Sequence, residues 1–213
     1  MIKYVLASAA LVFSTQAMAK KDAKKKADKA ATAAVETYKI DTKESSVAWK
    51  GFKKVGSTHN GHISVKEGQV EVDAKGVVKG GTVAIDMATI SNEDLKDSAD
   101  YQKKLIGHLS SEDFFNVTKY PTSTFKVLSV TPGKDANQIT VKGEFTMIGQ
   151  TQPIEFPATV KVDKGVLTGE ALVKIDRTKW GLKYGSGSFF KELAGDKIIA
   201  DEFELNLKLV AKK

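Results

Sequence analysis

The chain has 213 residues, a formal net charge of +7 and no cysteine. Without cysteine, neither a disulfide nor a lipid anchor on an N-terminal cysteine can form. Six lysines and two aspartates lie in the segment from Lys20 to Lys29, and Lys3 lies before it, which leaves about +2 on residues 30–213. A nucleic-acid-binding domain carries its basic charge on the folded surface, so a basic tail beside a nearly neutral remainder argues against that class.

The first 19 residues have the three parts of an export signal. A positive start, Met1 to Lys3, precedes a run of about ten apolar residues that ends at Phe13, and Ala17-Met18-Ala19 is a small-x-small cleavage pattern. A retained membrane anchor is the alternative, but spanning a bilayer takes roughly 20 apolar residues. The sequence therefore predicts a signal peptide over residues 1–19, cleavage after Ala19 and a periplasmic mature protein.

Residues 20–37 are rich in lysine and alanine and contain no aromatic residue. This composition is typical of a solvated linker. The alternative is a peripheral contact of Lys20 to Lys29 with anionic lipid headgroups, worth about 1 kcal/mol per lysine near the surface. No apolar face accompanies these charges, which favours the linker.

From residue 38 the chain alternates between apolar and polar residues, which indicates strands with one buried face. Charged residues such as Lys126, Lys142 and Glu144 occupy the intervening positions, so these faces cannot contact hydrocarbon and a transmembrane barrel is disfavoured. Glycine-containing turns are expected at residues 66–68, 73–76, 131–134, 148–150 and 163–165. The alternating segments begin at Val47, Ile63, Val70, Val83, Phe125, Ile139, Ile154, Ala171 and Phe203.

Two segments depart from this alternation. Residues 97–115 place Tyr101, Leu105 and Leu109 at a spacing of four, with Ser98 or Asp100 available as the N-cap, which predicts a helix followed by a short turn. Residues 186–193 are a second short helical candidate. An all-β domain over residues 38–213, closed as a barrel or sandwich with two short helical inserts, is the expected architecture.

Six sequence motifs stand out along the domain. Two of them form the most specific segment, from His108 to Phe125, where Leu-x-x-x-x-Phe-Phe is followed by Tyr-Pro-x-x-x-Phe. The other four run from Val47 to Gly61, Gly80 to Asp86, Val141 to Gly149 and Ile175 to Gly181. In order and spacing these motifs resemble the YceI-like family of polyisoprenoid-binding proteins, and the resemblance covers about residues 38–210.

The resemblance implies an eight-stranded antiparallel, lipocalin-like barrel in an exported protein. Its bore would hold the chain of a polyisoprenoid or a ubiquinone-like lipid, and no other cofactor is required. An eight-stranded barrel is just wide enough for a slim ligand if inner side chains do not fill it. Periodicity does not distinguish an open bore from one filled by ordinary core.

Candidate lipid-binding residues follow from the apolar faces and from the aromatic residues near the helical segments. Phe114, Phe115 and Tyr120, with Phe189 and Phe190, are expected either to grip a ligand at the mouth or to fix the inserts to the barrel end. The full set is Val47, Trp49, Ile63, Val65, Val83, Ile85, Phe114, Phe115, Tyr120, Phe125, Val141, Phe145, Phe156, Val173 and Trp180.

The polar candidates are few. His59 and His62 flank a glycine without a ligand spacing typical of a metal site, so no metal is expected. His108 is expected either to stabilise a helix C-terminus or to bind a headgroup. Arg177 is expected either to recognise a headgroup or to pair with a carboxylate such as Asp176, Asp196 or Asp201.

No catalytic motif is present in the sequence, so an enzyme is not expected. The expected partner is an isoprenoid lipid rather than a nucleic acid, and a homodimer is left open. The alternative function is a structural or stress-response module that acts through its surface and has a filled barrel core.

Overall fold

The computed structural model describes residues 35–213. The predicted signal peptide of residues 1–19 and the lysine-rich segment from Lys20 to Lys29 lie outside the described residues. Nine strands follow in chain order: β1 (Val35–Ile40), β2 (Ser46–Phe52), β3 (Thr58–Asp73), β4 (Val78–Asp86), β5 (Thr122–Pro132), β6 (Gln138–Met147), β7 (Gln150–Asp163), β8 (Val166–Asp176) and β9 (Glu202–Lys212).

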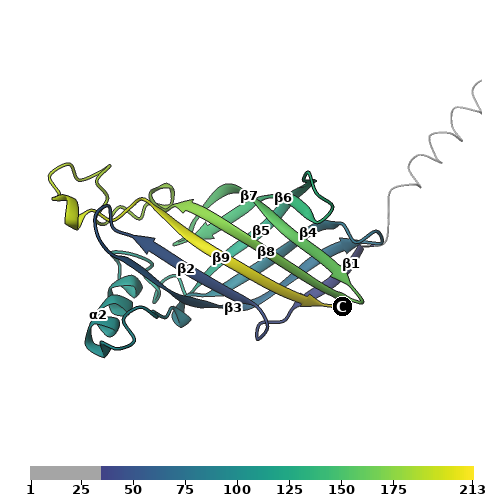
Figure 1. The fold of residues 1–213 in the computed structure, drawn as a ribbon, viewed down its shortest axis with the longest axis horizontal. Helices are drawn as coiled ribbons and strands as arrows, with labels where there is room; N and C mark the ends of the chain where they lie inside the picture. Colours follow the sequence, from purple (N-terminus) through teal and green to yellow (C-terminus); the bar gives the residue numbers. More distant parts are fainter. Residues whose placement is uncertain (1–34) are drawn as a thin grey trace, which may run out of the picture. The chain divides into compact units, whose positions relative to one another are not determined.

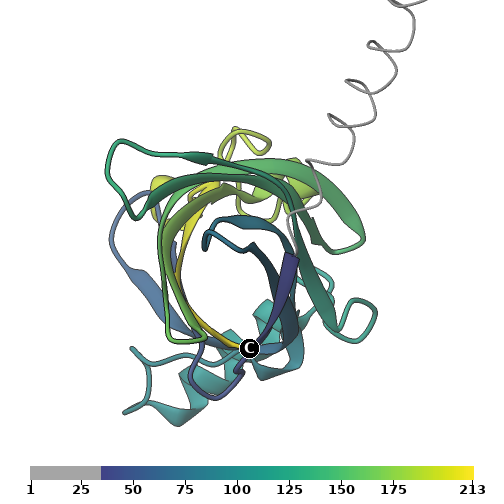
Figure 2. The same ribbon diagram turned by 90° about the vertical axis from the view of Figure 1, so that its right-hand side faces the viewer.

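Eight of these strands close into an antiparallel barrel (Figures 1 and 2). Strands β2 to β9 pair in chain order, and β9 pairs back with β2, so the ring has no free edge. Strand β1 is a ninth, short strand that pairs with β9 through Ile40 and Ala211 and lies beside β3. The predicted eight-stranded, all-β barrel is confirmed, and β1 begins at Val35, within the range assigned to the linker.

The two-residue periodicity of the sequence becomes the inside and outside of the barrel. Lys126 and Lys142 are exposed on the outer face, whereas the neighbouring Val141 and Phe145 are buried within it. Two hairpins close through two-residue turns, Ile148–Gly149 and Lys164–Gly165, in which all four residues have positive φ. Such turns match the right-handed twist of the flanking strands.

The turn expected at residues 66–68 is wrong. Strand β3 continues through this segment for 16 residues and absorbs an extra residue in a bulge between Val65 and Glu67. Gly68 serves close packing instead of a turn, because a Cβ there would lie 2.6 Å from both Ile40 Cδ1 and the Thr82 carbonyl oxygen.

The first helical prediction is confirmed and the second is wrong. Helix α2 spans Ala99–Ser110 with Ser98 at its N-cap position, although the Ser98 side chain makes no capping hydrogen bond. Residues 186–193 form turns with no helix. Ser186 instead makes a bridge with Ile199, and Gly185 at φ +65° bends the chain away from helical geometry.

The two ends of the barrel differ. At the end where β1 and the C-terminus lie, apolar side chains of β1, β3, β4, β8 and β9 are buried. At the opposite end, helix α2 and the long connection from β8 to β9 flank the opening (Figure 1). Within residues 35–213 no helix has both the length and the apolar character needed to cross a bilayer. The buried residues at the β1 end are Tyr38, Ile40, Val72, Val78, Leu167 and Ala211.

Candidate binding cavity

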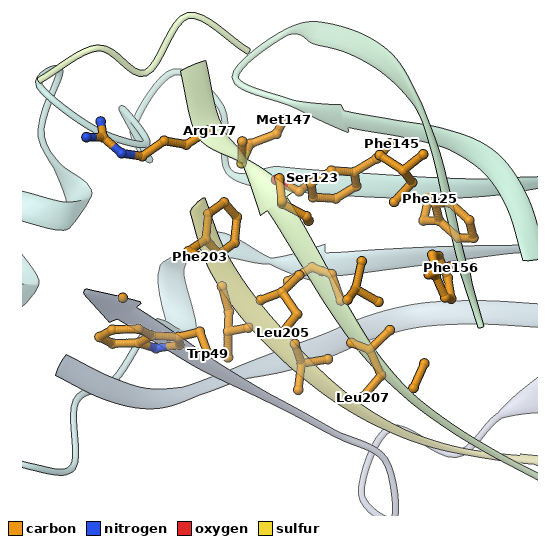
Figure 3. A pocket seen from close by; sticks show the side chains of 18 of the residues that line it. Trp49, Ser123, Phe125, Phe145, Met147, Phe156, Arg177, Phe203, Leu205 and Leu207 are labelled. Atoms are coloured by element: carbon orange, nitrogen blue, oxygen red, sulfur yellow. The ribbon is translucent and has the colours of Figure 1, made fainter. Parts of the chain in front are cut away.

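The barrel encloses a cavity of about 790 Å³ lined by side chains from all eight strands of the ring. Figure 3 shows how residues are distributed along the cavity. Phe125 and Phe156 lie toward one end, Trp49 and Phe203 toward the other, and Leu205 lies between them. Its volume falls within the range of about 300–1,000 Å³ typical of ligand pockets. Phe190, Tyr184 and Lys197 also line it while being exposed, so the cavity reaches solvent at the α2 end.

The bore is not filled by its own side chains. Phe203, Leu205, Leu207 and Leu209 line the cavity at alternate positions of β9, yet each keeps part of its surface accessible. In a close-packed protein core such residues would be fully covered, since voids larger than a water molecule are few. The expected alternative of a filled barrel core is therefore wrong.

Small residues in the wall make room for this cavity. Ala158 on β7 and Gly169 and Ala171 on β8 line it where larger side chains would project into the bore. Gly143 on β6 leaves space for the ring of Phe125 on the neighbouring strand β5, because a Cβ at residue 143 would lie 2.4 Å from Phe125 Cζ. The width of the bore thus depends on side-chain volume as well as on strand number.

Twelve of the fifteen candidate residues line the cavity, although their contact with a ligand stays a prediction. They come from seven strands and from the turn after α2. The twelve are Val47, Trp49, Ile63, Val83, Ile85, Phe114, Phe115, Phe125, Val141, Phe145, Phe156 and Val173.

Val65, Tyr120 and Trp180 do not line the cavity. Val65 belongs to the buried cluster at β3. Tyr120 packs on the β6–β7 turn, where a Cβ at Gly149 would lie 2.8 Å from its ring. Trp180 lies behind the wall: its indole N–H donates to the Phe145 carbonyl at 3.0 Å and its ring packs on that of Phe145. A buried tryptophan needs such a hydrogen-bond partner, which explains its structural position.

Several lining residues were missed by the sequence analysis. The alternation of Phe203, Leu205, Leu207 and Leu209 in β9 was visible as a strand but was not assigned to the site. Met87 likewise continues the alternation of Val83 and Ile85 but was not assigned to the site. Leu182, by contrast, lies in the connection after β8, where no periodicity identifies the inward side.

One side of the mouth is fixed by the segment that precedes α2. The indole N–H of Trp49 donates to the Ser91 carbonyl at 3.0 Å, and the same carbonyl oxygen lies where a Cβ of residue 61 would be, so Gly61 is required there. The buried side-chain amide of Asn92 donates to the Asn60 carbonyl at 3.0 Å. Trp49 therefore both lines the cavity and positions its rim.

His59 reaches this rim from inside the barrel. Its Nδ1 lies 2.7 Å from Asp94 Oδ2, and the Asn60 backbone N–H donates to the other oxygen of that carboxylate at 2.9 Å. Burial opposes ionisation of Asp94, but hydrogen bonds from Asn60, His59 and Asn92 outweigh it and lower the pKa of Asp94 below its ordinary value. The His59–Asp94 pair therefore joins β3 to the segment that precedes α2.

The other histidines are paired in the same way. His62 Nδ1 lies 2.7 Å from Glu93 Oε1 on the outer surface. His108, in the last turn of α2, lines the cavity, contacts the rings of Phe114 and Tyr184 edge-on, and has Asp113 3.1 Å from Nε2. Within residues 35–213 no three acidic or histidine side chains are grouped as metal ligands.

The opposite side of the mouth is held by Arg177. Its buried guanidinium donates three hydrogen bonds to the backbone carbonyls of Leu182, Ile199 and Ala200, at 2.8, 3.1 and 3.0 Å. Asp201 lies 3.8 Å away, and burial lowers the pKa of Arg177 against the support of this carboxylate.

Arg177 thus has a structural role at this end. Figure 3 shows its guanidinium directed away from the apolar side chains of the bore. The five N–H donors of a guanidinium suit such convergent binding of carbonyls. Of the two expected roles, the pairing with Asp201 fits this geometry, and the backbone contacts were not anticipated.

A closed antiparallel barrel with an unfilled apolar bore open at one end has the architecture of a lipocalin-like binding protein. The chain belongs to the YceI-like family, because the model of the YceI-like domain matches residues 38–211. The six sequence motifs had indicated the same family.

Relatives and solved structures agree with this assignment. Protein YceI of Shigella flexneri is 43% identical over 51 residues, which cover 24% of this chain and 26% of that protein. A UPF0312 protein of Vibrio cholerae is 32% identical over 119 residues, which cover 55% of this chain and 59% of that protein. The matched regions therefore span less than two thirds of either relative.

Two crystal structures share the fold. That of Burkholderia cenocepacia BcnA has a TM-score of 0.63 and 25% sequence identity, and covers 81% of this chain and 99% of that protein. That of the Campylobacter jejuni YCEI protein has a TM-score of 0.53 and 21% identity, and covers 71% of this chain and 81% of that one. Both support the barrel fold.

Proposed function

We propose that this protein is a periplasmic, non-enzymatic carrier that holds the chain of a polyisoprenoid or isoprenoid quinone in the bore of its barrel. The observation that carries the proposal is the 790 Å³ cavity, which the barrel wall encloses and which its own side chains leave unfilled. Family membership and the predicted export signal support the same function and compartment.

The chemistry of the wall favours a long apolar chain. Burying one methylene group stabilises a complex by about 0.8 kcal/mol, so several isoprene units bind tightly without polar contacts. The central part of the bore offers aromatic and branched aliphatic surface from Phe125, Phe156 and Leu207.

Polar groups meet the cavity at its mouth. His59, His108 and Tyr184 all line it at the α2 end, where hydrogen-bonding groups remain close to solvent. A ligand with an apolar tail and a small polar head therefore fits with its tail inside and its head between these three side chains. Arg177 also lines the cavity, but three of its five N–H groups donate to backbone carbonyls, which favours a structural role over headgroup binding.

Quenching of tryptophan fluorescence by a quinone tests the proposal. The chain has two tryptophans, of which Trp49 lines the cavity and Trp180 does not. A ubiquinone analogue with a ten-carbon tail is expected to quench the delipidated protein saturably at about one ligand per chain, because burial of its tail at about 0.8 kcal/mol per methylene drives binding. Trp49→Phe is expected to remove most of this quenching.

The matched control is the same quinone ring without its tail. It should quench both tryptophans weakly and without saturation at the same concentration. Equal quenching by the two compounds, or quenching unchanged in Trp49→Phe, would show that the tail of the quinone does not enter the bore.

A further inference from the structure

Exposed apolar side chains gather on one side of the cavity mouth. The loop of residues 53–57 and the connection of residues 183–199 form one structural unit, here called the lip. The Lys54 backbone N–H donates to the Ile198 carbonyl at 2.9 Å, and a Cβ on Gly195 would lie 3.7 Å from Val55. The lip exposes Val55 (60%), Tyr184 (44%), Phe189 (47%) and Phe190 (40%).

This concentration is unusual for the molecule. Nine large apolar side chains are exposed within the described residues, and the lip holds four of them. Single exposed apolar residues elsewhere are ordinary, whereas a cluster marks a contact surface. Tyr101 on α2 and Leu172 on the wall of β8 are exposed singly and serve as comparisons.

Positive charge accompanies the apolar side chains of the lip. Five lysines and two carboxylates lie on it, and the ammonium group of Lys183 lies 4.6 Å from the ring centre of Phe189. The opposite rim, residues 91–119, has four lysines and six carboxylates. Lysine beside exposed aromatic residues is the composition that binds the interface of an anionic bilayer. The lip lysines are Lys53, Lys54, Lys183, Lys191 and Lys197.

The lip is also continuous with the cavity. Tyr184, Phe190 and Leu193 belong to the lip and line the cavity as well. A lipid chain that left a bilayer through water would expose each methylene at a cost of about 0.8 kcal/mol. A continuous apolar path from the bilayer surface to the bore removes that cost. This continuity identifies the partner as a membrane, because no protein ligand requires it.

We propose that the lip docks the mouth of the barrel onto an anionic lipid bilayer, so that the lipid's apolar chain passes between membrane and bore without crossing water. The inference rests on the proposed carrier function for its purpose. It concerns the exposed surface of the lip, which shares only its inner side chains with the cavity and does not include the lysines of Lys20 to Lys29.

The test uses the full mature chain and vesicles of equal parts phosphatidylglycerol and phosphatidylcholine. The double variant Val55→Ser/Phe189→Ser removes two exposed apolar side chains that do not line the cavity. Vesicle binding is expected to weaken about tenfold, because interfacial affinity scales with buried apolar area. Transfer of the ten-carbon quinone from vesicles to protein, followed by Trp49 quenching, is expected to slow correspondingly.

Two controls make the result specific. Tyr101→Ser on the opposite rim and Leu172→Ser on the barrel wall should bind vesicles as the unsubstituted chain does. Uptake of quinone from detergent micelles should be unchanged in the double variant, since its bore is intact.

Unchanged vesicle binding in the double variant overturns the proposal, and so does equal binding of the unsubstituted chain to pure phosphatidylcholine vesicles. Lip-dependent vesicle binding by a protein that takes up no quinone in any format upholds the docking surface and contradicts the carrier function instead. The two proposals therefore fail in different measurements.

Discussion

Replacing Ala171 by tryptophan is expected to weaken lipid binding about a hundredfold while the barrel stays folded. Ala171 lines the cavity from β8 and is the register partner of Leu207 on the neighbouring strand β9. An indole at this position would occupy space that a ligand needs for about four methylene groups, a loss of about 3 kcal/mol. Affinity for the quinone analogue, measured by titration, should fall about a hundredfold.

The stability of this variant is as informative as its affinity. In a filled core an added indole costs about 1–3 kcal/mol through overpacking, whereas in an open bore it covers accessible wall. The thermal midpoint of Ala171→Trp should therefore be equal to or above that of the unsubstituted protein. Leu172→Trp is the matched control, because the neighbouring side chain is exposed on the outer face. A destabilised Ala171→Trp with unchanged quinone affinity would mean that the bore is not the binding site.

Replacing Arg177 by methionine is expected to cause the largest loss of stability of any substitution at the mouth. The change leaves three backbone carbonyls, of Leu182, Ile199 and Ala200, without their donor, and leaves Asp201 without its nearest positive charge. Removing one partner of a buried charged pair costs about 3–5 kcal/mol. For a domain of this size the thermal midpoint should fall by roughly 10 °C.

Hydrogen exchange distinguishes a local effect from a global one. Amides in residues 182–201 should exchange faster in Arg177→Met than in the unsubstituted chain, because the connection before β9 loses its anchor. Arg177→Lys should lose an intermediate amount of stability, since an ammonium group keeps the charge but lacks the planar fork of a guanidinium. A thermal midpoint equal to that of the unsubstituted protein would show that Arg177 is not the anchor.

Strand alternation explains why much of the barrel could be predicted. Each apolar position in β6, from Ile139 to Met147, points inward in the structure as its period of two requires. Two-residue turns with glycine fixed the hairpins on either side of β7. The turn expected at Gly68 is absent, because a glycine required for close packing in a bulged strand has the same sequence appearance as a turn glycine.

The cavity and its mouth were harder to predict, for a physical reason. Periodicity gives the direction of a side chain but not the volume left between facing walls, so the open bore depended on distant small residues such as Gly143 and Ala171. The contacts of Arg177 and Trp180 join segments far apart in the chain through backbone carbonyls. Every residue has a backbone carbonyl, and no sequence motif identifies these ones.

Native mass spectrometry of the protein purified from its source cells, followed by extraction and identification of any bound lipid, tests the carrier function most directly. The unsubstituted protein should carry an isoprenoid lipid at about one molecule per chain, the occupancy that a single enclosed bore allows. The same preparation of Ala171→Trp should be free of it. A ligand-free mass for the unsubstituted protein, together with no uptake of added quinone or polyprenol, would contradict the carrier function.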